Sequence, residues 1–360
     1  MAFPKKTITD EKIFCILVLS SSFFFFFFHS SVFVGAQTTF ITRKDFAVDN
    51  DVNEFNEYSA VIVVSKDGRG DSLTVQGAVD LVPDLNTRRI KIFVSPGVYR
   101  EKVVIPSTKP FISFIAHPNS TTVLSWNSKA SDPSPTGDGI VGTYNSASVA
   151  VESDYFIASD ITFENTSGDA PPGSVGLQAV ALRVTGDKAV FYRCRFLGSQ
   201  DTLFDHIGRH LFLQCYIRGS IDFIFGSARS LYEDCEIEST ARSSGAIAAS
   251  QRNGYDDICG FSFFNCRVRG SGKVYLGRAW GRFSRIIYAF CEMEGIVIPQ
   301  GWNDWGDSTR RFTTLFAEFN CTGPGSDRSQ RVPWMTSLTY DQIRQFTDRS
   351  YIDDQEWLRI

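Results

Sequence analysis

The chain has 360 residues and a formal net charge of −4, and 43% of its residues are hydrophobic. This composition is typical of a soluble globular protein with an ample core, and the length fits two average domains or one large β architecture. Because no basic stripe runs along the chain, nucleic acid is excluded as an expected partner.

The first 36 residues have the pattern of a secretory signal peptide. Three lysines precede a long apolar run, residues 13–36, which ends in Val34-Gly35-Ala36. A charged start, an apolar stretch and a small-residue cleavage site define such a peptide. We therefore expect cleavage near Ala36 and a secreted, extracellular protein that has no contact with the membrane afterwards. An uncleaved membrane anchor is the alternative, although the serines and His29 in the run weaken it as a span.

Three tripeptides match the acceptor sequence for N-glycosylation, a modification of secreted proteins. Their asparagines are Asn119, Asn165 and Asn320. Such tripeptides arise often by chance, so these three agree with secretion without establishing it.

Ordered structure is expected to begin after a polar, unpatterned lead-in at residues 37–57, in a single domain over 58–360. Residues 58–68 alternate like a strand and close with a glycine turn. Residues 74–83 have the pattern of a short amphipathic helix that Pro83 stops. Residues 90–105 predict two strands around Pro96-Gly97.

A short sequence pattern recurs beyond residue 155. Each copy has an aromatic residue, then two residues, a cysteine, one residue and a hydrophobic residue. The copies are FYRCRFLG (191–198), FLQCYIRG (212–219), YEDCEIES (232–239), FFNCRVRG (263–270), YAFCEMEG (288–295) and an earlier one, FIASDITF (156–163), aligned with Ser159 at the cysteine position. Copies 20 to 35 residues apart predict the coils of a right-handed parallel β-helix, an all-β fold with short flanking helices. An ordinary β-sandwich is the alternative, but it rarely repeats one residue type at one strand position.

The repeated cysteines are first of all small buried side chains that stack from coil to coil. They have neither CxxC pairs nor the spacing of a zinc site. Cys215 and Cys235 are 20 residues apart, which is one coil of the shortest length. In a secreted protein these two could also form a disulfide, worth roughly 3 kcal/mol if it is unstrained.

Two acids hold the same position on consecutive coils. Asp201 lies seven residues after Cys194, and Asp222 lies seven residues after Cys215. Since neighbouring coils are about 4.8 Å apart, both carboxyl groups should emerge side by side. Two carboxylates so close together cannot both be charged without repulsion, so one should have a high pKa and the other a low pKa. This is the arrangement that acid–base chemistry requires. The alternative is a pair of turn residues whose carboxylates accept hydrogen bonds from the backbone.

Other catalytic patterns are weaker. The chain has no G-x-S-x-G sequence, which argues against a nucleophile-elbow serine hydrolase. Residues 137–142 match a dinucleotide fingerprint, but they follow a loop-like segment instead of a strand, so we interpret them as a flexible loop.

Several blocks in family order resemble the pectinesterases, the pectin methylesterases of plant cell walls. These blocks are GVYREKV (97–103), LQAVALRV (177–184), FLGSQDTLF (196–204), GSIDFIFG (219–226) and LGRAW (276–280). The resemblance covers roughly residues 58 to 345. The family fold is the right-handed parallel β-helix, which agrees with the repeat.

The resemblance implies a role for each of five polar residues. Asp222 would be the nucleophile that attacks the methyl-ester carbonyl, and Asp201 the general acid and then the general base. Gln178 and Gln200 would donate hydrogen bonds to the oxyanion. Arg278 would pair with Asp222 and keep it ionised.

The resemblance also implies that Trp280 and Phe225 offer flat apolar surface to sugar rings, and that Cys215 and Cys235 pair as in plant members. It requires neither a metal ion nor an organic cofactor. The expected partner is pectin, that is, methyl-esterified homogalacturonan. A proteinaceous pectinesterase inhibitor is a further candidate partner, and the expected state is a monomer.

The chain departs from the family at Ala279, where the usual LGRPW has proline, so the loop of Arg278 lacks a fixed φ. Leu177 stands where glycine is usual. Only about twenty residues separate the expected cleavage site from the first strand, so we expect no inhibitor-like helical pro-domain.

Together these features predict a secreted pectinesterase, a carboxylic ester hydrolase that removes methyl esters from cell-wall pectin and leaves pectate. One alternative is another pectin-active β-helix enzyme, a lyase or polygalacturonase. The other is a catalytically weak wall-binding protein with the same groove.

Overall fold

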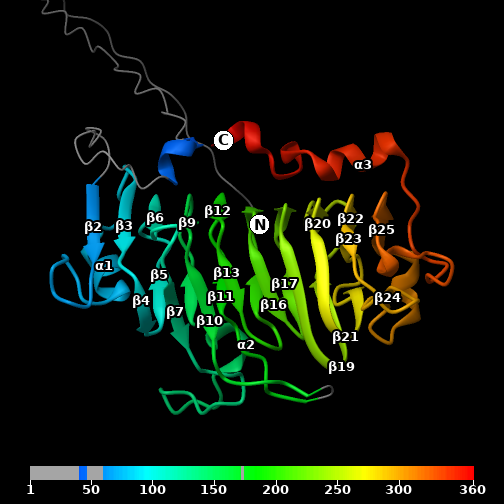
Figure 1. Cartoon of the computed structure of the whole chain (residues 1–360), viewed down its shortest axis with the longest axis horizontal. Coiled ribbons are helices and arrows are strands. Elements are labelled where there is room, and N and C mark those ends of the chain that lie inside the picture. Colours follow the sequence, from blue (N-terminus) through cyan, green and yellow to red (C-terminus); the bar gives the residue numbers. More distant parts are fainter. Residues whose placement is uncertain (1–39, 47–59, 172–173) are drawn as a thin grey trace, which may run out of the picture. The chain divides into compact units, whose positions relative to one another are not determined.

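Parallel strands stack side by side through most of the chain, and successive strands of each sheet come from successive coils (Figure 1). The computed structural model describes residues 40–46, 60–171 and 174–360. The expected signal peptide at 1–36 lies outside these residues. Within them, no helix has the length and apolar character needed to cross a membrane.

One sheet, here called the back sheet, contains ten parallel strands. In spatial order they are β2 (Ala60–Val64), β3 (Ile90–Val94), β6 (Ile112–Ile115), β9 (Ile157–Ser159), β12 (Ala189–Tyr192), β15 (Arg209–Leu213), β18 (Arg229–Glu233), β20 (Gly260–Phe264), β22 (Arg285–Ala289) and β25 (Leu315–Phe319).

The other large sheet has two arms, which the long strands β19 (Glu236–Ser250) and β21 (Arg267–Arg278) join because each runs through both arms. The first arm adds β4 (Gly97–Arg100), β7 (Thr122–Trp126), β10 (Thr162–Asn165), β13 (Arg195–Leu197), β16 (Tyr216–Gly219) and β23 (Glu292–Met293). The second arm adds β5 (Val103–Ile105), β8 (Val149–Val151), β11 (Leu182–Val184), β14 (Leu203–Asp205), β17 (Ile221–Gly226) and β24 (Trp302–Asn303).

Short elements flank the coils. They are α1 (Val75–Leu81), α2 (Gly142–Asn145), α3 (Tyr340–Thr347), the 3₁₀ turns η1 (Arg43–Asp45), η2 (Ser308–Phe312), η3 (Pro324–Ser326), η4 (Arg349–Ile352) and η5 (Asp354–Glu356), and the parallel pair β1 (Ile41–Thr42) and β26 (Leu358–Arg359). Each full coil passes from the back sheet to the first arm and then to the second. The β-helix prediction is confirmed.

The repeated pattern has a structural cause at the corner between the back sheet and the first arm. The residue before each cysteine has a positive φ, for example 54° at Gln214 and 56° at Asp234. This left-handed residue turns the chain and directs the next side chain inward. The repeated aromatic residues stack in the core, with 4.6 Å between the ring centroids of Phe212 and Tyr232 and 4.7 Å between those of Tyr232 and Phe263.

The strand register corrects the repeat alignment at both ends. Thr162 pairs with Arg195, so Ile161, and not Ser159, occupies the cysteine position of the first copy. At the other end Tyr288 pairs with Glu318. A seventh copy that the consensus missed therefore follows, with Cys321 at the cysteine position.

The stacked cysteines are buried, as predicted, and Cys215 and Cys235 are free thiols in this structure, so the disulfide expected between them stays a prediction. Each of these two thiols donates to a backbone carbonyl of the coil before it. The Cys215 Sγ lies 3.3 Å from the Phe191 oxygen, and the Cys235 Sγ lies 3.3 Å from the Phe212 oxygen.

Most local predictions agree with the structure. Helix α1 begins after Thr74, whose side chain accepts a hydrogen bond from Gly77 N, and it ends before Pro83. Residues 90–105 form three strands, β3, β4 and β5, instead of two. Part of the lead-in also differs from the expected loose segment, since β1 pairs with β26.

The candidate glycosylation site at Asn165 is wrong for this fold. The side-chain amide is buried and donates to the carbonyl oxygens of Ser128 and Val180, at 2.9 and 3.0 Å. A glycan needs an accessible asparagine. Asn119 and Asn320 are exposed and stay candidates.

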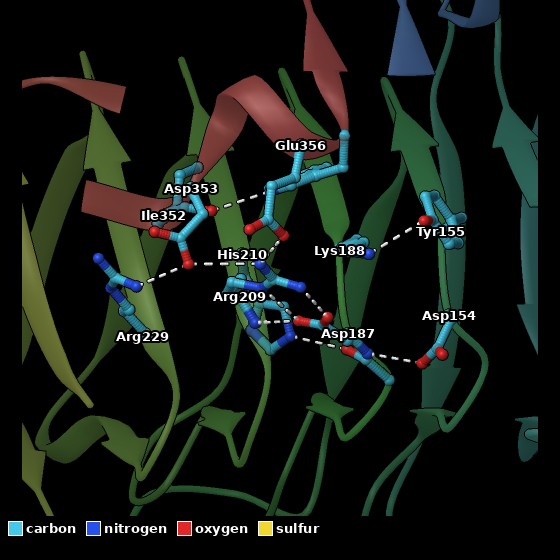
Figure 2. A network of polar contacts seen from close by, with 12 residues as sticks. Asp154, Tyr155, Asp187, Lys188, Arg209, His210, Arg229, Ile352, Asp353 and Glu356 are labelled. Carbon is cyan, nitrogen blue, oxygen red and sulfur yellow. Dashed lines mark hydrogen bonds and ion pairs between the residues drawn. The ribbon is translucent and has the colours of Figure 1, made fainter. Parts of the chain in front are cut away.

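The segment after α3 covers the outward face of the back sheet. Ion pairs fasten it, and Figure 2 shows Arg209 at their centre. The Arg209 guanidinium contacts Asp187 of the preceding coil at 2.6 Å, and also Asp353 at 3.3 Å and Glu356 at 2.7 Å in the C-terminal segment. Asp353 also accepts from Arg229 at 2.8 Å.

Candidate active site

The two predicted acids lie side by side on the second arm. The bridge from Gln200 to Ile221 and the pairing of Leu203 with Ile224 place Asp201 and Asp222 at equivalent positions of consecutive coils. The backbone N–H of Asp201 donates to the Ile221 carbonyl at 3.1 Å.

Both acids have left-handed backbone conformations, with φ of 62° at Asp201 and 46° at Asp222. Aspartate tolerates this region better than most residues. The left-handed residue Asp222 interrupts the in-and-out alternation of side chains along the strand. As a result, the consecutive residues Phe223 and Ile224 both lie in the interior core. The acids are therefore free to face outward while the residues after them stay buried.

A cleft with a volume of about 520 Å³ opens above the acids. All seven residues that the sequence analysis selected for catalysis and sugar binding line it: Gln178, Gln200, Asp201, Asp222, Phe225, Arg278 and Trp280. Rings line one side of the cleft. Phe225 stacks on Phe204 with 4.3 Å between centroids and lies 6.1 Å from the ring of Trp280.

Arg278 approaches Asp222 from two coils further along. Its Nη1 lies 3.1 Å from the Asp222 Oδ2, and its guanidinium carbon lies 4.0 Å from the centre of the Trp305 ring. The Asp222 Oδ1 is buried and finds no hydrogen-bond partner in the part of the chain that the structure describes. One carboxylate oxygen is thus paired with the arginine, and the other is not engaged.

The surroundings of the two acids separate their pKa values. Burial raises the pKa of Asp222 to about 6, while the charge of Arg278 opposes the rise. Burial and the neighbouring charge of Asp222 raise the pKa of Asp201 well above its usual value, and Arg278 offsets only part of this. At neutral pH the arrangement therefore favours a carboxylate at Asp222 and a neutral acid at Asp201.

The two glutamines lie beside the acids. Gln200 is 9% exposed, and its side-chain Oε1 has no hydrogen-bond partner among residues 40–46, 60–171 and 174–360. The main-chain oxygens of Gln200 and Gln178 accept hydrogen bonds from Ala179 N and Ala130 N, at 3.1 and 2.8 Å. These bonds fix the backbone, and both glutamines line the cleft.

Comparison with known proteins identifies the family of this chain. The family model described as Pectinesterase matches residues 61–355. The chain belongs to the pectinesterase family. The predictions of this family and of a carboxylic ester hydrolase are thereby confirmed.

Several pectinesterases are similar to this one. Pectinesterase QRT1 of Arabidopsis thaliana is 55% identical over 302 residues, which cover 83% of this chain and 79% of the relative. A pectin methylesterase from carrot is 33% identical with a TM-score of 0.76, covering 82% of this chain and 94% of that one. One from Aspergillus niger is 28% identical with a TM-score of 0.71, covering 83% and 95%.

Sequence reasoning missed other residues that line the cleft of this pectinesterase. Trp305 comes from the loop after β24, Tyr144 from α2 and Phe204 from β14. Phe204 follows Asp201 by three residues, as Phe225 follows Asp222, so the coil spacing that paired the acids could have found it. The loops that carry Trp305 and Tyr144 lie outside the repeat and offered no such signal.

Proposed function

We propose that this pectinesterase hydrolyses the methyl esters of homogalacturonan, releases methanol and leaves pectate. The observation that carries the proposal is the acid pair, in which Arg278 contacts only one member and the pKa values are raised to different extents. An ester hydrolase that works through a carboxylate needs one ionised and one protonated acid.

In the first half of the reaction, the Asp222 carboxylate attacks the ester carbonyl carbon. The carbonyl becomes an oxyanion, to which the amides of Gln178 and Gln200 donate hydrogen bonds. When the C–O bond to the methoxy group breaks, Asp201 transfers its proton to the leaving oxygen. Methanol departs, and the sugar is bound to Asp222 as an acyl-enzyme.

In the second half, Asp201 is a carboxylate and acts as a general base. It takes a proton from a water molecule that attacks the acyl carbon, and the bond to Asp222 breaks. Asp222 returns to its ionised form, Asp201 is again protonated, and the sugar keeps a free carboxylate. Arg278 contacts Asp222 at 3.1 Å and favours its charged form.

The aromatic residues supply the binding surface for the polymer. Phe225 and Trp280 present ring faces and edges in the cleft, and Phe204 extends this apolar side by one coil. Sugar rings have apolar faces that pack on aromatic side chains, while polar groups fix the orientation of the ligand. We further propose that the protein is secreted and acts in the cell wall.

A methanol assay on highly esterified pectin tests the proposal. We expect release by the wild type, and a loss of about 10³-fold or more in Asp222→Asn, since removal of a nucleophile abolishes the covalent route. Asp256→Asn is the matched control, because Asp256 is exposed and does not line the cleft.

The rival activities give different products. New ultraviolet absorbance without methanol would indicate a lyase, and new reducing ends without methanol a polygalacturonase. Equal, negligible methanol from the wild type and from Asp222→Asn would favour a wall-binding protein.

A further inference from the structure

Arg278 lies at the start of a short segment, Arg278-Ala279-Trp280, that leaves the end of β21. The Ala279 N–H donates to the Asn303 carbonyl at 2.9 Å, a bond that proline cannot make. It continues the pairing of β21 with β24, in which Arg278 is opposite Asn303.

The carbonyl groups of this segment have a partner outside the strand. Arg310 Nη1 donates to the Ala279 oxygen at 2.5 Å and to the Trp280 oxygen at 2.7 Å. The Arg310 Nε donates to Asp307 Oδ2 at 3.2 Å. Asp307 is itself fixed as the N-cap of η2, where it accepts from Thr309 N at 3.0 Å. The guanidinium is therefore held at both sides.

A third contact comes from the same loop. Trp305 places its ring over the Arg278 guanidinium, with 4.0 Å between the guanidinium carbon and the ring centre, a geometry in which the ring attracts the cation. The backbone N–H of Trp305 donates to the Asn303 Oδ1 at 2.9 Å. Asn303 thus supports the backbone of both Trp305 and Ala279.

We propose that Arg310 is a positioning residue for ester hydrolysis, which together with Trp305 holds Arg278 against the Asp222 carboxylate. The inference rests on the proposed function. Arg310 is not among the residues that line the cleft, so it acts through the segment that carries Arg278. We call Arg310, Trp305 and Asn303 the arginine clamp.

The clamp has an electrostatic consequence. The charged groups that face Asp222 are Asp201 from the neighbouring coil and Arg278 from β21. Burial raises the pKa of Asp222 to about 6, and Arg278 opposes this rise. If the guanidinium moves away, the pKa of Asp222 rises further, and the enzyme loses its ionised nucleophile at a higher pH.

The test compares Arg310→Gln with the wild type in steady-state methanol release across pH. We expect kcat to fall about tenfold, as is typical when hydrogen bonds from a charged donor are lost, with KM changed by less than about twofold. The acid limb of the kcat/KM profile should move to higher pH. Arg310→Lys, which retains a charged donor, should recover part of the loss.

Arg282→Gln is the matched control. Arg282 lies two residues from Trp280, is exposed, and its side chain makes no hydrogen bond or ion pair within the described residues. It removes the same charge without touching the clamp, so it should keep the wild-type kcat and pH profile. If it reproduces the effect of Arg310→Gln, general charge explains the result and the clamp is rejected.

Thermal unfolding shows whether each variant folds. If Arg310→Gln does not fold, Trp305→Leu against Trp305→Phe carries the test, because phenylalanine keeps a ring over the cation and should shift the acid limb less. If the wild type releases methanol and Arg310→Gln has the same kcat and the same pH profile of kcat/KM, the arginine clamp is overturned and the proposed function stands. No methanol from the wild type overturns the proposed function, and the clamp with it.

Discussion

Asp201 and Asp222 have identical side chains, and their surroundings alone distinguish them. The Arg278 guanidinium lies 3.1 Å from Asp222, while the charge that acts most strongly on Asp201 is that of the other acid of the pair. Because a positive charge favours ionisation and a negative charge opposes it, the arrangement favours Asp201 as the neutral member of the pair. This difference, and not the residue type, supports the proposal that Asp222 is the nucleophile.

A pH dependence follows from these two groups. The proposed mechanism requires Asp222 in its ionised form, and burial raises the pKa of Asp222 to about 6. Below this value Asp222 binds a proton, so kcat/KM should fall about tenfold per pH unit on the acid side. Since burial and Asp222 raise the pKa of Asp201, its proton should persist through neutral pH. The pH profile of methanol release checks this, and activity that stays constant down to pH 4 would contradict it.

The two glutamines permit a separate prediction. The Gln200 side chain is buried beside both acids, so Gln200→Ala should lower kcat by about 10²–10³ with little change in KM, the usual cost of an oxyanion donor. Gln200→Glu should be worse, since a third carboxylate would repel the developing negative charge. Stopped assays of methanol release measure both variants. Similar kcat values for wild type and Gln200→Ala would remove Gln200 from the mechanism.

At the scale of residues, the sequence predicted those site residues that occupy a repeated position of the coil. Asp201 and Asp222 follow the repeated cysteines at equal distance, so the pair was visible without a structure. Trp305 was not, because its position over Arg278 depends on a loop with no counterpart in other coils. Asn165 matched a glycosylation sequence, but whether an asparagine is accessible depends on burial, which a tripeptide does not encode.

At the scale of elements, three neighbouring strands share a buried polar network. Asp205 at the end of β14 contacts His210 Nδ1 of β15 at 2.5 Å and accepts from the hydroxyl of Tyr232 in β18 at 2.7 Å. The other ring nitrogen of His210 lies 2.9 Å from the Gly186 carbonyl oxygen. Since both ring nitrogens face acceptors, the histidine satisfies both only as the charged imidazolium.

The charged His210 predicts a pH-dependent stability. Burial alone would lower the pKa of His210, but the charge of Asp205 and the hydrogen bonds to Asp205 and Gly186 raise it. A raised pKa stabilises the fold fully below the unfolded value of about 6.5, and this stabilisation is lost as the pH rises through the folded value. The free energy of unfolding in urea should therefore decline more steeply above pH 6.5 in the wild type than in His210→Gln. The exposed His117, changed to Gln, should leave the slope unchanged. Equal slopes for all three proteins would show that His210 is neutral.

The strands could be predicted from the sequence where their core side chains recur once per coil. Phe212, Tyr232 and Phe263 stack on consecutive coils, and their spacing predicted the β-helix. The first copy was misaligned because Phe156 imitates the repeated aromatic, although Ala158 is the residue in register with Phe191. The last copy was missed because Glu318 replaces the aromatic residue and pairs with the buried Arg331 at 2.7 Å.

At the scale of the whole molecule, distant parts of the chain share one apolar layer on the back sheet. It joins Leu211 and Leu231 of the sheet to Ile41 near the described start and to Trp357 near the end. Such contacts connect residues more than a hundred positions apart and have no period, so the sequence predicted a loose lead-in there. None of these four residues lines the cleft. The apolar layer on the back sheet therefore contributes to stability, while the cleft on the second arm carries the proposed chemistry.

Trp357 tests this separation. Its ring is fully buried, and its Nε1 donates to the Ile352 carbonyl at 2.9 Å. Trp357→Ala should lower the free energy of unfolding by about 3–5 kcal/mol, the usual cost of a large buried aromatic, and urea unfolding measures it. Glu356→Gln is the control at the neighbouring position: its side chain is 61% exposed and loses only the ion pair with Arg209, so its effect should stay within about 1 kcal/mol. The kcat for methanol release of folded Trp357→Ala should equal that of the wild type, because the cleft is built on the second arm and the tryptophan packs on the back sheet. A kcat that falls in parallel with stability would mean that the C-terminal segment also shapes the cleft.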